Sequence, residues 1–219
     1  MNVAKTVYSD GTFSIVPKLF QQLYTLHVEV QDMVVPVVYF LLPNKRESTY
    51  RMAFSKFKKL CPDFQPDEIM TDFEIAATNA YDSLFPLAHL KGCFFHLSQA
   101  IYRKIQKIPE VNSHYRSDPV YARNLKMIPA LAFLPPEDVE YGFETLEHCD
   151  LYEKHAEFLA DLLNYFEIHN IGRLHGSQRR EPRYAIRYGM FVIYYMLCVE
   201  TLFAIMNSFL DFGTSITIP

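Results

Sequence analysis

The spacing of hydrophobic residues along this chain changes near Asn44. Before Asn44 the spacing is typical of strands, and directly after Asn44 it is typical of a helix. In residues 25–31 apolar and polar side chains alternate strictly, which is typical of a half-buried strand. Residues 33–42 form an almost continuous apolar run, which predicts a strand covered on both faces, with a bulge or an unpaired N–H at Pro36. Beyond Asn44, a helix-start residue, apolar side chains recur at helical spacing until Pro62.

The same reasoning predicts alternating strands and helices in the first half of the chain and helices alone in the second. The remaining strands are expected at residues 5–8, 68–72 and 88–95, with a turn at 9–12. The remaining helices are expected at residues 73–84, 97–108, 118–133, from 135 onward, and 151–168. The order β-β-β-α-β-α-β-α implies an α/β fold with a mixed sheet and helices packed on it.

Composition excludes several classes of protein. Of the 219 residues, 50% are hydrophobic and 21% charged, which is enough apolar surface for a core and excludes a disordered or collagen-like chain. A formal charge of −4 excludes a uniformly basic binder but allows a local basic groove. The four cysteines form no Cys-x-x-Cys pair, which favours a reducing compartment, and residues 1–10 lack a signal-peptide pattern.

Two aspartates end predicted strands that come from distant parts of the chain. Asp10 ends the first strand and Asp72 ends the fourth. If those strands are parallel neighbours, both carboxylates project from one carboxyl edge of the sheet, where open α/β sheets place ligands. Such carboxylates repel each other unless a cation lies between them, and Mg²⁺ or Mn²⁺ suits oxygen ligands and phosphoryl transfer. The alternatives are an N-cap at Asp72 and a simple turn at Asp10-Gly11.

A Cys-x-x-His pair, Cys93 and His96, lies at a predicted strand-to-helix junction. Such a pair can supply two zinc ligands, although no second pair at suitable spacing completes the site. The alternative is a buried cysteine beside a histidine that caps or packs at the start of the helix.

Basic residues gather in two places. The helix at 97–108 carries Arg103, Lys104 and Lys107 away from its apolar face. A second group of arginines lies in the loop at 172–187: Arg173, Arg179, Arg180, Arg183 and Arg187. These side chains are candidates for binding phosphates of a nucleic acid, and the alternative for the loop is a solvated linker.

Residues 188–210 are nearly all apolar, and three interpretations remain open. The segment is an unrelated sequence fused to the domain, a buried helix that covers the sheet, or a membrane anchor with Glu200 at its centre.

Several motifs in order resemble the MULE (Mutator-like element) transposase domain over about residues 8–108, in its animal branch, whose members often carry a FLYWCH zinc finger upstream. The motifs are Asp10-Gly11-Thr12-Phe13, residues 17–25, Pro36-Val37-Val38-Tyr39, Leu42-Pro43-Asn44-Lys45, Met70-Thr71-Asp72-Phe73-Glu74, Gly92-Cys93-Phe94-Phe95-His96 and Ser98-Gln99-Ala100. A weaker likeness continues through residues 130–138, 165–173 and 182–184.

The resemblance implies an RNase H-like core at residues 1–108 and a DDE-type transposase that uses Mg²⁺ or Mn²⁺. By motif match, Asp10 resembles the first catalytic acid and Asp72 the second, and residues 109–170 resemble the helical insertion before the third. The rest of the chain is divided into a basic loop at residues 171–187 and an apolar tail at residues 188–219. The resemblance also implies a nuclear protein that binds transposon ends and target DNA and can form homo-oligomers, without a small-molecule substrate or a membrane.

The sequence departs from the family where the third acid is expected. The family has a glutamate in an Asn-Asn-x-x-Glu-Gly segment, and no such segment follows Arg187. Glu200 is the only glutamate of the tail, but its neighbours do not match the motif, so the third role is not assigned to it. We therefore expect a catalytically deficient transposase. The alternative is a non-catalytic module that uses the same fold to bind DNA or a partner protein.

Overall fold

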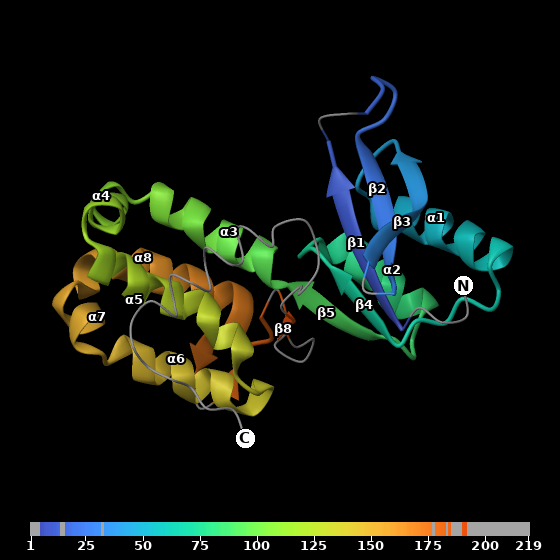
Figure 1. Ribbon diagram of the computed structural model, residues 1–219. Coiled ribbons are helices and arrows are strands. Elements are labelled where there is room, and N and C mark those ends of the chain that lie inside the picture. Colours follow the sequence, from blue (N-terminus) through green and yellow to red (C-terminus); the bar gives the residue numbers. More distant parts are fainter. Residues whose placement is uncertain are drawn as a thin grey trace.

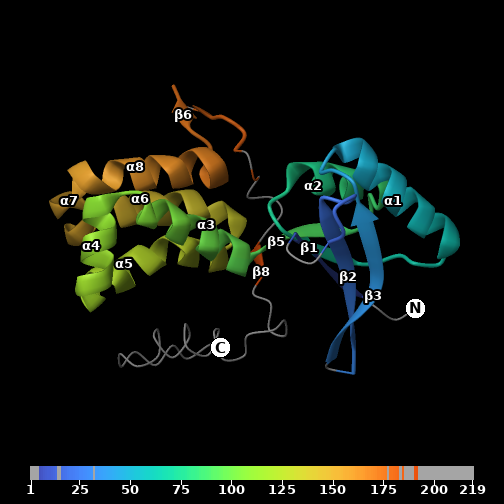
Figure 2. The same cartoon turned by 90° about the horizontal axis from the view of Figure 1, so that it is seen from above.

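The computed structural model describes residues 5–13, 16–31, 33–176, 178–182, 184 and 190–191. Figure 1 shows a sheet with two helices packed on it and, beside it, a bundle of helices drawn in green to orange. We call these the sheet part, from β1 to β5 with α1 and α2, and the helical part, from α3 to α8. Seen from above, α3 begins where the two parts meet (Figure 2).

The sheet has six strands in the order β3-β2-β1-β4-β5-β8. They are β1 (Thr6–Thr12), β2 (Gln22–Val30), β3 (Met33–Leu42), β4 (Glu68–Thr71), β5 (His89–Cys93) and β8 (Met190–Phe191). The strands β1, β2 and β3 pair antiparallel, whereas β1, β4, β5 and β8 pair parallel. The predicted mixed sheet and the predicted order of elements through α3 are therefore confirmed.

Helices α1 (Glu47–Leu60) and α2 (Ile75–Leu84) cover one face of this sheet. They form because aromatic and alanine side chains recur at helical spacing, and these side chains are buried against the strands. Phe54 of α1, which is fully buried, stacks on Tyr81 of α2 with 4.2 Å between ring centroids. The resulting core fixes the position of the strand ends that carry the site.

The helical part begins directly after β5. Its main helices are α3 (Phe94–Gln106), α4 (Pro109–Ser117), α5 (Pro119–Ala130), α6 (Val139–Glu147), α7 (Asp150–Lys154) and α8 (Ala156–Phe166). They are followed by the π-helical turn η3 (Glu167–Ile171) and a small hairpin, β6 (Leu174–His175) and β7 (Gln178–Arg179). The short 3₁₀ turns η1 (Leu131–Phe133) and η2 (Pro136–Asp138) join α5 to α6. These helices bury a second hydrophobic cluster of their own.

The predicted bulge at Pro36 is confirmed, because the register between β2 and β3 shifts there: Leu26 pairs with Val38 and His27 with Pro36. The turn predicted for residues 9–12 is wrong. The strand β1 continues through these residues because they pair with β2 as far as Thr12 and Leu23.

The second half of the chain is helical, as predicted, but its boundaries differ. Helix α4 was not anticipated and begins at Pro109, a favourable first helical residue. Asp118 caps α5 by accepting hydrogen bonds from the backbone N–H groups of Val120 and Tyr121. The single helix predicted for 151–168 is divided near His155 into α7 and α8.

The apolar segment at 188–210 lies outside the described residues, except for β8. Within the part of the chain that the structure describes, no helix combines the length and apolar character that crossing a membrane requires.

Candidate acidic site at one edge of the sheet

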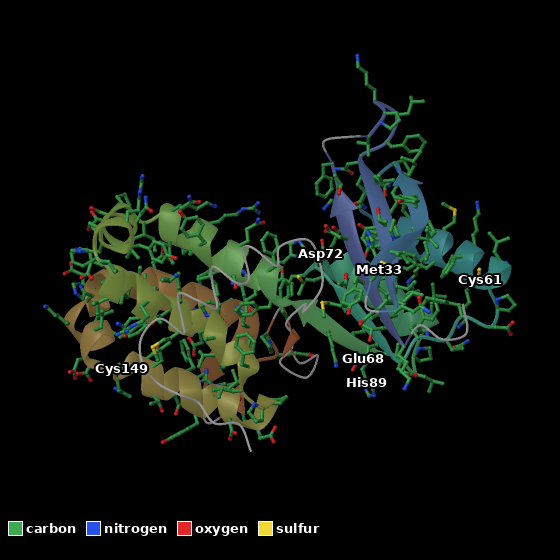
Figure 3. All side chains as sticks on the ribbon, in the orientation of Figure 1. Met33, Cys61, Glu68, Asp72, His89 and Cys149 are labelled. Carbon is green, nitrogen blue, oxygen red and sulfur yellow. The ribbon has the colours of Figure 1, made fainter. Side chains whose placement is uncertain are left out.

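Asp10 and Asp72 come together at the carboxyl edge of the sheet. The strands β1 and β4 are parallel neighbours, and Tyr8 pairs with Met70. Asp10 lies two residues beyond Tyr8, still within β1, and Asp72 lies two residues beyond Met70, directly after β4. Figure 3 shows Asp72 at the end of β4 where the helical part begins, opposite the end that carries Glu68. The expectation that the two strands are parallel neighbours is confirmed.

The two faces of the sheet differ in what their side chains contact. Val7 of β1 and Ile69 of β4 belong to the cluster with α1 and α2, whereas Tyr8 and Met70 form a small separate cluster with Cys93. Because side chains alternate along a strand, Asp10 continues the row of Tyr8 in β1. Asp72 directly follows β4, and the charges of Asp10 and His96 both act on its carboxylate.

The Asp72 carboxylate is fixed by its own segment. Its Oδ1 accepts hydrogen bonds from the backbone N–H of Glu74 at 3.3 Å and from the Thr71 hydroxyl at 3.4 Å. The alternative that Asp72 caps α2 is wrong, because the N-cap residue is Glu74. Burial raises the pKa of Asp72, the negative charges of Glu74 and Asp10 raise it further, and His96 lowers it.

The Asp10 side chain is more open, with 45% of its surface exposed. A simple turn at Asp10-Gly11 is wrong, because both residues lie inside β1. Gly11 lies close to a neighbouring side chain of β2. A Cβ added to it would lie 2.7 Å from Oε1 of the buried Gln22, so a larger residue here would require the Gln22 amide to shift.

The third strand end at this edge contributes His96 from the first turn of α3. Its Nε2 lies 3.7 Å from Oδ1 of Asp10, and its buried Nδ1 has no hydrogen-bond partner among the described residues. Cys93, the N-cap of α3, is buried, and burial raises the pKa of its thiol, which favours the protonated form. A zinc-binding role for Cys93 and His96 stays a prediction.

A polar network beneath the edge was not anticipated from the sequence. Glu74 accepts a hydrogen bond from the Tyr50 hydroxyl at 2.7 Å and forms an ion pair with Lys45 at 2.7 Å. The buried Gln22 amide in turn donates to the Tyr50 hydroxyl. Glu74 and Lys45 belong to the motifs quoted above, so the signal was present, but nothing in the sequence showed that the two segments meet.

A second hydroxyl network lies under Asp72. The fully buried Tyr24 hydroxyl donates to Ser9 Oγ at 3.0 Å and lies 3.4 Å from Thr71 Oγ1. Ser9 Oγ donates to the carbonyl of Met70 at 3.1 Å and so ties β1 to β4 just before the two acids. Burial, followed by the charge of Asp72, raises the pKa of Tyr24, so its hydroxyl stays protonated.

The predicted phosphate-binding residues have different surroundings. Arg103 and Lys107 are exposed on α3, whereas Lys104 forms an ion pair with Asp161 at 2.6 Å. In the loop, Arg173 donates to Asn164 Oδ1 at 2.5 Å, Arg180 is exposed, and Arg183 lies outside the described residues.

Arg179 differs from the other loop arginines that the structure describes, because only 11% of its side chain is exposed. Its guanidinium contacts carboxylates of Glu140 at 3.2 Å, Glu144 at 3.3 Å and Glu167 at 2.7 Å. Three acidic partners neutralise this charge, and the geometry therefore gives Arg179 a structural role in joining the hairpin to α6 and η3.

The donors at the acidic edge fit a hard divalent cation in type. Two carboxylates supply oxygen ligands, and a cation between them would offset their mutual repulsion, which adds to the effects of burial and of Glu74 in raising the pKa of Asp72. The described residues include no group of three or more His, Cys, Asp or Glu side chains arranged to hold a metal ion. A metal-binding role for Asp10 and Asp72 stays a prediction.

Comparison with known families gives one match. Residues 6–100 match the family model of the MULE transposase domain. The matched range runs from β1 into α3 and includes Asp10, Asp72, Cys93 and His96. None of the curated proteins matches the chain. The chain is therefore similar to the MULE transposase domain over these residues.

Proposed function

We propose that this chain is a transposon-derived protein with an RNase H-like core, in which Asp10 and Asp72 hold a divalent cation at a DNA phosphodiester. The parallel register of β1 and β4 carries the proposal, because it brings both acids to one edge inside the range that matches the transposase domain. In this proposal α4 to α8 form the helical insertion, the protein acts in the nucleus, and its copies assemble on transposon ends and target DNA.

The chemistry follows from the groups at the edge. Bound Mg²⁺ or Mn²⁺ would supply Lewis-acid stabilisation of the phosphodiester and a more acidic water. Asp72, fixed by Thr71 and Glu74, would provide the rigid ligand. Asp10, half exposed, would provide the ligand that DNA approaches first. His96 Nε2, beside Asp10, is placed to hold a proton near the reacting oxygen.

We also propose that the chain is catalytically deficient in strand transfer. The family's third acidic motif does not follow Arg187, and the described residues supply two carboxylates at the edge rather than three. Two ligands hold paired ions less firmly than three. Efficient joining of DNA ends by the full chain with Mn²⁺, abolished by Asp10→Asn, would overturn this deficiency.

The proposed function is tested by whether Mn²⁺ strengthens DNA binding through the two aspartates. We expect Mn²⁺ to raise the affinity of the full chain for duplex DNA, because a bridging cation removes repulsion between carboxylates and phosphates. Asp10→Asn and Asp72→Asn should each abolish the Mn²⁺ effect, while Asp67→Asn, at the exposed opposite edge, should keep it. An equal Mn²⁺ effect in all four proteins contradicts the proposal.

The second candidate function is a non-catalytic module that binds DNA or a protein. It is favoured by the absence of a three-residue metal group among the described residues. Mn²⁺ titration separates the two functions, because a module without a metal site shows no Mn²⁺ binding that depends on Asp10 and Asp72.

A further inference from the structure

A groove of about 450 Å³ opens beside the acidic edge, between α3, α4 and α5. Its lining includes Phe95, Tyr102, Tyr115 and Leu125, with Ser98, Gln99 and Lys126 as polar members. Phe95 directly precedes His96, so the groove begins within one residue of the group that contacts Asp10. A volume of this size is typical of ligand pockets.

Aromatic rings are open to solvent along this groove. Phe95 is 49% and Tyr102 40% exposed, and Tyr102 lies 5.5 Å from Tyr115 between ring centroids. Large aromatic side chains gathered at the surface in a groove mark a binding site more often than isolated ones do. At the groove, the buried Ser98 hydroxyl has no hydrogen-bond partner among the described residues.

A row of basic side chains follows the same helix beside the groove. At 3.6 residues per turn, His96 and Arg103 fall on one face of α3, and Phe95 and Tyr102 fall on the adjacent face. Lys107, the C-cap residue of α3, continues the line of His96 and Arg103. We call His96, Arg103 and Lys107 the basic row. Because a helix rises about 1.5 Å per residue, the row extends about 16 Å from the acidic edge.

We propose that an unpaired segment of a DNA strand lies along α3, with its bases on Phe95 and Tyr102 and its phosphates on the basic row. The inference rests on the proposed function, because the strand is the one presented to Asp10 and Asp72. A groove lined by apolar rings does not suit phosphates, whereas the flat face of a base stacks on an aromatic ring. In a duplex those faces are covered by neighbouring bases, so the groove selects a single strand.

The test compares affinities of the full chain for a labelled single-stranded oligonucleotide and for the duplex of the same sequence, by fluorescence anisotropy without divalent cations. Stacking contributes about 1–3 kcal/mol per base, so Phe95→Ala with Tyr102→Ala should weaken single-strand binding about ten-fold or more. Duplex affinity should change less than about two-fold. Tyr141→Ala, on α6 and 75% exposed, is the matched control and should change neither affinity.

A milder variant guards against misfolding. Phe95→Leu with Tyr102→Leu keeps apolar packing but removes the rings, and it should show the same selective loss. An equal loss for single strand and duplex, or no loss for either, overturns the inference. A change in oligomeric state or thermal stability without a selective loss also overturns it, because another protein surface or another segment of this chain then covers the groove.

The two proposals fail in different ways. Asp72→Asn should keep the single-strand preference, since the groove does not depend on that carboxylate. If the unmodified chain binds duplex but has no preference for the single strand, this inference fails and the proposed function stands. If it binds neither form, both fail.

Discussion

The sheet part and the helical part each have a core, but the two cores contain different chemistry. In the sheet part, the hydroxyls of two core tyrosines contact residues that flank Asp72. The Tyr24 hydroxyl lies beside the Thr71 hydroxyl, and the Tyr50 hydroxyl donates to Glu74. In the helical part, the hydroxyl of the buried Tyr152 donates to the backbone carbonyl of Asn124 at 2.7 Å, a contact between two helices of the same part.

In our proposal, the two parts have different functions. The core of the sheet part positions an acidic edge, so substitutions deep inside it should affect metal binding. The helical part keeps its core separate and presents its functional groups on the surface of α3. The predictions that follow test this division.

The largest expected effect is on folding of each part. Phe54→Ala in the sheet core should cost about 3–5 kcal/mol and Leu159→Ala in the helical core about 2–5 kcal/mol, since both side chains are fully buried. If the cores are separate, native-state hydrogen exchange should rise mainly in α1 and α2 for Phe54→Ala and mainly in α3 to α8 for Leu159→Ala. Uniform loss of protection in both variants would show one shared core.

A smaller loss is expected where the sheet core supports the acidic edge. Tyr50→Phe removes the hydroxyl that joins the Gln22 amide to Glu74 and should cost about 1–3 kcal/mol in urea unfolding. Tyr39→Phe, at a side chain that is 59% exposed, is the control and should cost almost nothing. Equal stabilities of the two variants would show that the hydrogen bonds of the Tyr50 hydroxyl do not stabilise the protein.

The corresponding prediction for the helical part concerns Arg179 and the three glutamates that its guanidinium contacts. Arg179→Met leaves three glutamates without their partner and should lower the free energy of unfolding by about 1–3 kcal/mol. Arg180→Met, at an exposed position, should stay within about 0.5 kcal/mol of the unmodified chain. If Arg179→Met instead leaves stability unchanged and weakens DNA binding, the original phosphate-binding prediction holds.

The smallest effect concerns pH, measured without divalent cations. Because the folded-state pKa of Asp72 is raised above its usual value of 3.8, the folded state holds this proton more tightly than the unfolded state. The contribution of Asp72 to stability is therefore fully present below the unfolded pKa and is lost as pH rises through the folded pKa. Asp72→Asn should flatten this part of the thermal unfolding profile and raise Tm at neutral pH. A steeper decline in the variant would contradict the raised pKa.

Much of the fold could be predicted from local sequence patterns. Strict alternation at 25–31 and the apolar run at 33–42 define β2 and β3, and Pro36 marks the bulge between them. The extent of β1 through Asp10-Gly11 could not be predicted, because turn-like residues there are overridden by pairing with β2.

The site could be predicted only in part. Asp10 and Asp72 could be found because each was expected at the carboxyl end of a strand and parallel strands share an edge, although β1 continues two residues beyond Asp10. The contact of His96 with Asp10, the ion pair of Lys45 with Glu74 and the acidic surroundings of Arg179 depend on packing between distant segments. Local periodicity carries no information about such contacts.

The central claim is that Asp10 and Asp72 share a cation, and thermal unfolding with Mn²⁺ tests it most directly. A ligand that binds only the folded state at a hundred times its Kd adds about 2.7 kcal/mol of stability. We predict a gain of that order for the unmodified chain and for Asp67→Asn, and none for Asp10→Asn or Asp72→Asn. An equal gain in all four proteins, or none in the unmodified chain, would contradict the shared cation.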